Sequence, residues 1–196
     1  MKLKEKLLGQ DNMETLASMV MVALARGLAG RWAEAEELEV RVMETRKRVL
    51  GEEHPSTLTS MANLASTYRN QGRWTEAEEL DERVMETRKR VLGEEHPDTL
   101  TSMANLASTF WNQGRWKEAK ELEVRVMETS KRVLGEEHPD TLTSMANLAF
   151  TLKSQSCNKE AISLMKKCFQ LRKQILGRQH PYTETSLEVL NEWVDT

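Results

Sequence analysis

The chain has 196 residues, of which 30% are charged, and its formal net charge at pH 7 is -3. Because positive and negative side chains nearly balance, the composition argues against a nucleic-acid-binding protein that relies on a basic face. No apolar run approaches the roughly 20 residues that span a bilayer, and the opening MKLKEKLLGQ lacks the apolar centre of a secretory signal. We therefore expect a cytoplasmic protein without nucleic-acid or membrane partners.

The two cysteines agree with a reducing compartment. Cys157 and Cys168 are 11 residues apart on one predicted helix, and at about 1.5 Å per residue this separates them by about 16 Å. That distance is too long for a disulfide, so an intracellular protein with reduced thiols is expected.

The most informative feature is a sequence that recurs with a period of 42 residues. Residues 51–92 and 93–134 differ at only 8 of 42 positions. Glycines at one phase extend the period along the whole chain, at Gly9, Gly51, Gly93, Gly135 and Gly177. Self-similarity at such a period indicates a stacked array of repeats.

In chain order, residues 1–9 read as the end of a second helix, because Met1 aligns with Met43. Four repeats of two helices and a closing helix follow, at residues 10–50, 51–92, 93–134, 135–176 and 177–196. We thus expect nine helices after the leading stub. In the outer repeats and the closing segment, helices are predicted over about Met13–Ala29, Arg31–Leu50 and Pro181–Val194, with the fourth repeat spanning Pro139 to Leu176.

The second repeat illustrates the helix signals. Its first helix is predicted from about Pro55, which suits a first turn, to Gln71, where Gly72 suits a left-handed cap. The apolar stripe of this helix consists of Leu58, Met61, Leu64, Ala65 and Tyr68.

The second helix of this repeat is predicted from about Trp74 to Leu92. Its apolar stripe consists of Trp74, Ala77, Leu80, Val84 and Val91. We expect two ion pairs with i,i+4 spacing on its outer face, Glu79–Arg83 and Glu86–Arg90. Neither helix can bury its stripe alone, so neighbouring repeats must stack.

Several residues of the repeat resemble the tetratricopeptide repeat, namely Leu64-Ala65, Tyr68, Gly72, Trp74 and Ala77. The phrase MANLASTY…NQGRWTEAEEL…RVMETRKRVLGEEHPDTL is similar to the 42-residue subclass of kinesin light chain and nephrocystin, which also forms sensor arrays of STAND-type receptors. The resemblance covers essentially the whole chain. It implies an all-α fold, a right-handed α-solenoid of helix-turn-helix repeats. The chain has no GxxxxGK[ST] segment, so any NTPase would lie outside it.

The resemblance also implies a binding surface, because first helices line the concave side in that family. The groove residues carried over to this chain are Asn63, Arg69, Asn70, Asn105, Trp111, Asn112, Asn147, Phe150 and Lys153. The first repeat offers an apolar end instead, with Ala17, Val20, Met21, Leu24 and Leu28.

Asn63, Asn105 and Asn147 recur at one phase, and a side-chain amide both donates and accepts hydrogen bonds. Repeats about 10 Å apart would place one asparagine at every third residue of an extended peptide, which rises about 3.3 Å per residue. The groove of kinesin light chain is similar, since asparagines at the matching phase hold cargo backbones. The alternative is that these asparagines bond to neighbouring helices or are inherited copies without a role.

Trp111 departs from the repeat, because Arg69 and Lys153 occupy its phase in the neighbouring repeats. With Phe150 it would form an apolar anchor flanked by cations, suited to an aromatic or acidic peptide. The alternative is a tryptophan that lies on the next helix pair.

Other conspicuous residues follow the repeat and predict structure. The histidines before proline, His54, His96, His138 and His180, are expected to be loop and capping residues. Trp32, Trp74 and Trp116 are expected in the core, and Cys168 is expected to be a buried thiol. No serine or cysteine has a non-repeating histidine and acid for a triad, so we expect no catalytic site, metal or cofactor.

The leading hypothesis is a non-catalytic scaffold that binds an extended segment of a protein partner in its concave groove. The alternative is a self-assembling module that stacks head to tail through its terminal helices, with Val189 and Leu190 on the exposed face. An enzyme is the weakest hypothesis, because nothing outside the repeat pattern forms a site.

Overall fold

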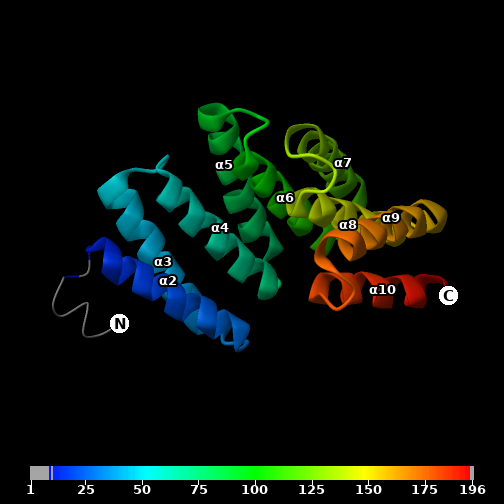
Figure 1. Ribbon diagram of the computed structural model, residues 1–196. Helices are drawn as coiled ribbons and strands as arrows, with labels where there is room; N and C mark the ends of the chain where they lie inside the picture. The colour runs from blue at the N-terminus through cyan, green and yellow to red at the C-terminus, as the bar shows by residue number, and fades with distance from the viewer. Residues whose placement is uncertain (1–8, 10, 195–196) are drawn as a thin grey trace. The chain divides into compact units, whose positions relative to one another are not determined.

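The computed structural model describes residue 9 and residues 11–194, which contain nine α-helices and no strand (Figure 1). The nine expected helices are confirmed over this range, and each predicted end lies within one residue of the observed one. The leading stub predicted at residues 1–9 lies outside the described residues, except for Gly9. The helices are α2 (Met13–Leu28), α3 (Trp32–Leu50), α4 (Pro55–Asn70), α5 (Trp74–Leu92), α6 (Pro97–Asn112), α7 (Trp116–Val133), α8 (Pro139–Ser154), α9 (Asn158–Leu176) and α10 (Pro181–Val194).

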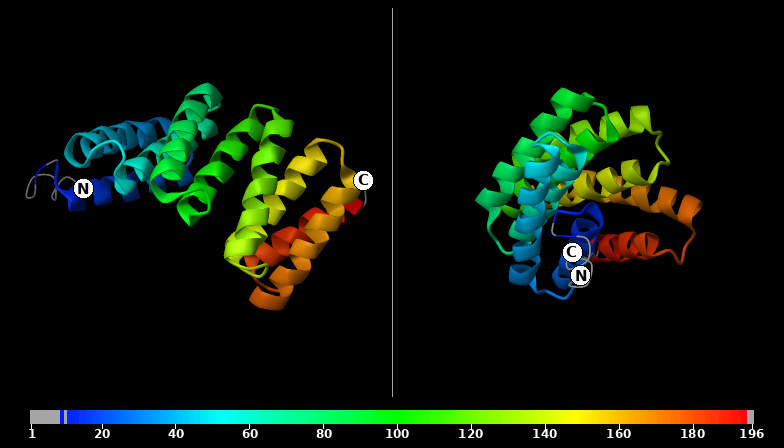
Figure 2. Two further views of the ribbon diagram at one scale, coloured as in Figure 1. Left: turned by 90° about the horizontal axis from the view of Figure 1, so that it is seen from above. Right: turned by 90° about the vertical axis from the view of Figure 1, so that its left-hand side faces the viewer.

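The chain divides into two compact units, residues 1–91 and residues 92–196, and each is described by itself. In the N-terminal unit, α2 packs against α3 and α3 against α4. In the C-terminal unit, each helix from α6 to α10 packs against the next. Both views of Figure 2 show α8, α9 and α10, coloured yellow to red, side by side. Within each unit the helix pairs therefore stack in chain order.

Apolar side chains between successive helices form the core of each unit. The N-terminal unit has two clusters of buried residues, Leu16, Met19, Ala23, Ala35, Leu38 and Val42 in one and Leu58, Met61 and Val84 in the other. The C-terminal unit buries Leu142, Met145, Ala146, Leu148, Ala149, Leu152, Ala161, Met165, Cys168, Leu190 and Trp193 together. Cys168 is thus the buried thiol that the repeat predicts. Ala65 and Ala77 are 0% exposed, and such small side chains allow helices to approach closely.

Histidine side chains cap the starts of α4, α6, α8 and α10, as expected. In each case the ring Nδ1 accepts a hydrogen bond from the backbone N–H two residues further on. The distances are 3.1 Å from Ser56 to His54, 3.1 Å from Asp98 to His96, 3.2 Å from Asp140 to His138 and 3.2 Å from Tyr182 to His180. This bond satisfies one of the N–H groups that a helix start leaves without an intrahelical partner.

The turn between the two helices of a repeat needs a left-handed residue. Gly72 and Gly114 have φ of 77° and 75° at this position, as the capping prediction requires. Ser156 takes the same position in the fourth repeat, with φ of 61°. A side chain is strained in this conformation, whereas glycine is not.

The core prediction is wrong for two tryptophans and one valine of the second helices. Trp74 and Trp116 are 41% and 40% exposed, and Val91 is 51% exposed. The tryptophans begin α5 and α7, and Val91 lies in the last turn of α5, so these side chains lie at helix ends. The buried face of α5 consists of Ala77, Asp81, Val84 and Arg88. The charged residues Asp81 and Arg88 belong to this buried face, but a pattern of apolar residues does not predict their burial.

The predicted i,i+4 ion pairs of α5 are also replaced by others. Its arginines pair with the two glutamates of the loop before α4, Arg83 with Glu52 and Arg90 with Glu53 at 2.7 Å. The C-terminal unit repeats the arrangement, with pairs Arg125–Glu94 at 2.5 Å and Arg132–Glu95 at 2.7 Å. The residues are about half exposed, so solvent weakens each pair. Together they fasten each interhelical loop to the second helix of its repeat.

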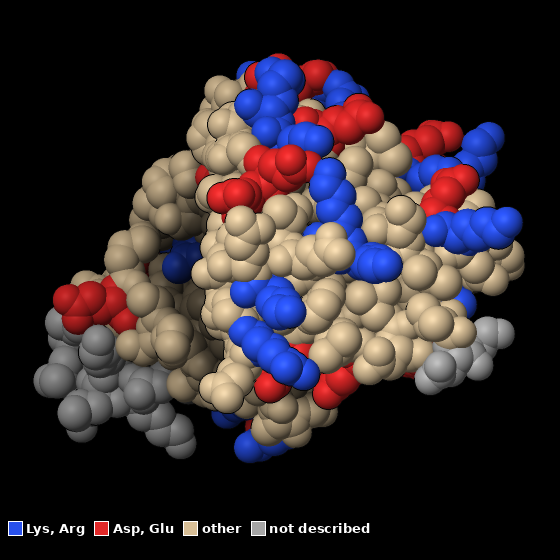
Figure 3. All heavy atoms as spheres, turned by 45° about the vertical axis from the view of Figure 1, so that its right-hand side comes forward, with Lys and Arg blue, Asp and Glu red and all other residues tan. Residues whose placement is uncertain are grey.

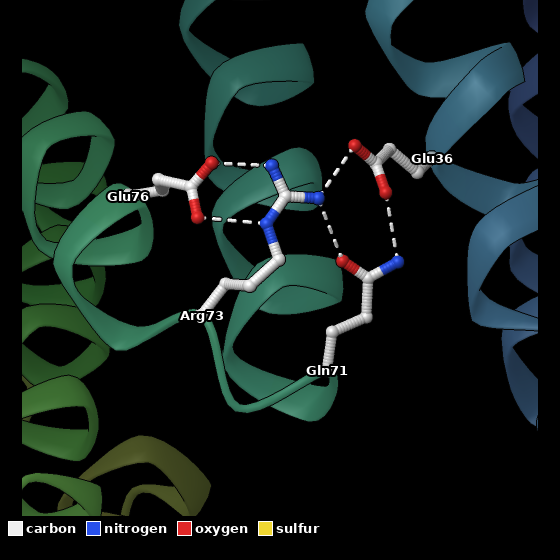
Figure 4. A network of polar contacts seen from close by, with 4 residues as sticks. All are labelled: Glu36, Gln71, Arg73 and Glu76. Atoms are coloured by element: carbon white, nitrogen blue, oxygen red, sulfur yellow. Dashed lines mark hydrogen bonds and ion pairs between the residues drawn. The ribbon is translucent and has the colours of Figure 1, made fainter.

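Arg73 joins the turn of the second repeat to the first repeat (Figure 4). Its Nε donates to Glu76 at 2.7 Å, and its Nη1 donates to Glu36 of α3 at 2.7 Å and to the side-chain oxygen of Gln71 at 3.1 Å. Gln71 in turn donates to Glu36 at 2.8 Å. The guanidinium also lies over the Tyr68 ring, 4.1 Å from its centroid. This network fixes the turn of the second repeat against α3 of the first repeat.

The left-handed position of Ser156 yields a stability prediction. Ser156→Gly should raise the free energy of unfolding by about 0.5–1 kcal/mol, because relief of the backbone penalty exceeds the entropy that glycine loses. Urea unfolding followed by circular dichroism measures the change. Gly114→Ser is the matched control and should lower stability by a similar amount. A less stable Ser156→Gly protein would contradict the assigned backbone conformation.

Candidate peptide-binding hollows

A hollow of about 230 Å³, here called the Ser130 hollow, lies between α6 and α8 with α7 as its floor. Its lining residues are Pro97, Leu100, Thr101, Ala104, Asn105 and Ser108 from α6, Val126, Ser130 and Leu134 from α7 and its end, and Asp140, Thr143, Ser144 and Asn147 from α8. Asn105 and Asn147 therefore contribute to different walls of one space.

A second hollow of about 250 Å³, here called the Glu123 hollow, adjoins the first in the C-terminal unit. It is lined by Ser108, Trp111, Asn112, Glu123, Asn147, Phe150 and Thr151. Ser108 and Asn147 belong to both hollows, so a chain bound over one of them would lie next to the other.

The N-terminal unit has a related hollow of about 260 Å³, here called the Glu39 hollow. It is lined by Ala23, Leu24, Gly27, Leu28, Trp32, Glu39, Asn63, Ser66, Thr67 and Asn70. Leu24 and Leu28 are 45% and 92% exposed, which agrees with the apolar end predicted for the first repeat.

Most of the predicted site residues line hollows. Asn63, Asn105, Trp111, Asn147 and Phe150 line the hollows of their own units. Asn70 and Asn112 line hollows too, but each donates its side-chain N–H to the carbonyl four residues earlier, on Ser66 and Ser108, both at 2.7 Å.

The two predicted cations, Arg69 and Lys153, each have a partner within their own unit. Arg69 lies 3.4 Å from Asp81 and is 16% exposed. Lys153 lies over the ring of Trp193, 5.7 Å from its centroid. Lys153 does not line the Glu123 hollow of its own unit. The charged residue of that hollow is the acid Glu123.

Trp111 combines the two roles that the sequence left open. Its indole N–H donates to the Ser154 hydroxyl at 3.0 Å, so the ring lies on the next helix pair. The ring is also 40% exposed and lines the Glu123 hollow with Phe150. Phe150 is held by an edge-to-face contact with Trp193, with ring centroids 5.3 Å apart. Both aromatic walls are therefore fixed before any ligand binds.

Sequence reasoning missed the acidic residues that recur in the second helices. Glu39, Asp81 and Glu123 share one phase and are 5%, 1% and 5% exposed. The pattern that would have revealed them is an acid that repeats within the apolar stripe. Asp81 has the Arg69 guanidinium beside it, whereas Gly27 and Trp111 take the place of that arginine in the first and third repeats. Oε2 of Glu39 and Oε2 of Glu123 have no hydrogen-bond partner.

Burial changes the proton affinity of these acids. Burial raises the pKa of Glu123 to about 7, and the neighbouring Thr151 hydroxyl opposes the rise only in part. Burial likewise raises the pKa of Glu39, again against a smaller effect of the Thr67 hydroxyl. Near neutral pH, Glu123 is therefore divided between a neutral acid and a buried carboxylate.

The raised pKa of Glu123 predicts a pH-dependent stability. The native protein keeps the proton of Glu123 at pH values where the unfolded chain has lost it, so stability falls as pH rises from about 4.5 to about 7. Glu123→Gln removes this loss and should raise the free energy of unfolding by about 2–3 kcal/mol near pH 8, with little change near pH 4. Urea unfolding at both pH values tests this. An equal effect at both would contradict the raised pKa.

Acidic and basic side chains both lie on the face that Figure 3 draws. Among the described residues, no three His, Cys, Asp or Glu side chains gather in a way that could hold a metal ion. No helix within residues 11–194 has the length and hydropathy to cross a membrane.

The chain matches known proteins through its repeats and their stacking. Residues 60–131, and separately residues 15–56 and 141–182, match sequence models of the tetratricopeptide repeat. Two crystal structures of nearly identical TPR-like repeats from a putative kinesin light chain of Podosopora anserina, one of them a variant, are each 31% identical to this chain. Each alignment covers 92% of this chain and 85% of the matched chain, and the TM-scores are 0.78 and 0.77.

More distant structures share the fold alone. BtubC (BKLC) from P. vanneervenii is 18% identical, with 99% of this chain and 77% of that one covered and a TM-score of 0.79. The apo form of RapI is 12% identical, with 83% and 57% covered and a TM-score of 0.69. The chain has no match among curated proteins. The repeat matches and the solved neighbours agree with the all-α helix-turn-helix solenoid, and the chain belongs to the tetratricopeptide repeat family, in its kinesin light chain-like subclass.

Proposed function

We propose that this protein is a non-catalytic scaffold that binds an extended peptide segment of a protein partner along the first helices of its repeats. A tetratricopeptide array is a protein–protein interaction scaffold in general terms. The finer proposal concerns where the partner binds. It assigns the partner to the side of α6 and α8 on which the Ser130 and Glu123 hollows open.

One observation carries this proposal. Asn105 and Asn147, one repeat apart, both line the Ser130 hollow. Both are partly exposed, so their amides can reach a ligand in that space. An amide pairs with both the N–H and the C=O of a peptide unit, and the spacing of helix pairs, about 10 Å, equals about three residues of an extended chain.

Head-to-tail assembly is less well supported by the packing of the last helix. Leu190 and Trp193 of α10 are 7% and 8% exposed and belong to the core of the C-terminal unit. Val189 packs against that core as well. Val189, Leu190 and Trp193 are thus already packed within one molecule. A charge at Leu190 would disturb this core, so it is not a clean probe of assembly.

Loss of either asparagine should weaken peptide binding. For peptides selected on the wild-type protein from a random display library, Asn105→Ala and Asn147→Ala should each reduce affinity by about three- to tenfold, since one lost hydrogen bond is worth about 0.5–1.5 kcal/mol. Isothermal calorimetry measures the affinity, and circular dichroism checks helix content.

Asn191→Ala is the matched control, because Asn191 is exposed on α10 and lines neither hollow. This control should bind as the wild type does. Unchanged affinity in both Asn105→Ala and Asn147→Ala, with helix content retained, would sink the proposal.

A further inference from the structure

At one position of the second helix, the first, second and fourth repeats have an arginine, whereas the third repeat has a serine. The residues are Arg46, Arg88, Ser130 and Arg172. Arg88 and Arg172 are only 8% and 7% exposed. A buried arginine that recurs at one phase has a structural task, and the replacement by Ser130 removes a long side chain from the same position.

The contacts of Arg46 and Arg172 show what the arginine does at this position. Arg46 of α3 donates from Nη1 to the backbone oxygen of Ser56 at 3.0 Å and to the hydroxyl of Ser60 at 2.8 Å. Arg172 of α9 donates from Nη1 to the hydroxyl of Ser186 at 2.9 Å and to the backbone oxygen of Tyr182 at 3.3 Å. In both places one guanidinium ties a second helix to the first helix of the next repeat.

The same acceptors are present beside Ser130, without the arginine. Asp140 and Ser144 are the residues of α8 that correspond to Ser56 and Ser60 of α4, and both line the Ser130 hollow. The hydroxyl of Ser144 donates to the carbonyl of Thr141 at 2.8 Å, which leaves its oxygen able to accept. The hollow of about 230 Å³ is lined by Ser130, which takes the place of the arginine, and by the two residues that would offer its acceptors, Asp140 and Ser144.

We propose that an arginine side chain of the bound partner fills the Ser130 hollow and donates to the Asp140 carbonyl and the Ser144 hydroxyl. This inference rests on the proposed function and names the chemistry of the partner. The contacts are those that Arg46 makes with Ser56 and Ser60 within the chain. The guanidinium suits two acceptors on one helix turn because its donors form a planar fork.

The neighbouring Glu123 hollow favours the same sign of charge. Glu123 is 5% exposed, and its Oε2 has no hydrogen-bond partner. A buried carboxylate gains most from a cation that reaches it, and the faces of Trp111 and Phe150 are attractive to cations as well. A second basic residue of the partner, beside the arginine, would therefore bind there.

The protein side of the test adds an arginine at two positions. Ser130→Arg supplies the guanidinium from within the chain, so we expect a higher urea midpoint than in the wild type and a loss of peptide affinity of about tenfold or more. Ser163→Arg is the matched control, because Ser163 is exposed on α9 and lines neither hollow, and it should bind within about threefold of the wild type. A Ser130→Arg protein that is less stable, or that binds equally well, would overturn the assignment.

The peptide side uses binders selected from a random display library and resynthesised. We expect the selected sequences to contain an arginine, and its replacement by citrulline, which keeps the shape and loses the charge, to reduce affinity by about tenfold. Replacement by lysine should reduce affinity by less than citrulline does. Tight binders that lack arginine, or that tolerate citrulline, would overturn this inference.

The two levels of the proposal fail in different ways. If selected peptides bind and Asn105→Ala and Asn147→Ala weaken them, while arginine and Ser130 make no difference, only the arginine assignment is lost. If selected peptides bind elsewhere and neither asparagine matters, the proposed function is lost with it.

Discussion

The structure depends on the burial of one side of each helix against neighbouring helices of the same unit. Neither helix of a repeat has enough apolar surface to fold by itself, so burial is complete only when pairs stack. Fully buried alanines such as Ala65 and Ala77 set how closely helices approach. Because the same residues recur every 42 positions, each repeat presents the same side chains to the same neighbours, and the backbone of one repeat predicts that of the next.

On such a scaffold, the repeats differ in surface and contacts at the few positions where their sequences differ. Ser130 in place of arginine coincides with a hollow, and Trp111 in place of Arg69 coincides with a buried carboxylate that has a free oxygen. Both changes lie in the third repeat, and both affect the same side of α6 and α8. The 8 differences between the second and third repeats are therefore where the function is best sought.

The helices, their ends and their caps could be predicted from the sequence, because glycine, proline and histidine mark them at fixed phases. The buried side of the second helices could be predicted only in part. Apolar spacing correctly predicts that Ala77 and Val84 are buried. Asp81 and Arg88 are buried as well, and the burial of a charged side chain depends on its polar partners, which the spacing of apolar residues does not reveal. The sequence also does not decide the role of the Trp111 ring, because the ring contacts Ser154, which lies 43 residues further along the chain.

The most direct test of the account follows the side-chain amide signals of Asn105 and Asn147 in a nuclear magnetic resonance titration with a selected peptide. The account predicts that these two signals shift together with those of Trp111 and Ser144, all of which line the two hollows. Shifts confined to the outer side of α7 and α9, around Arg125 and Lys167, would contradict the claim that the first helices form the binding surface.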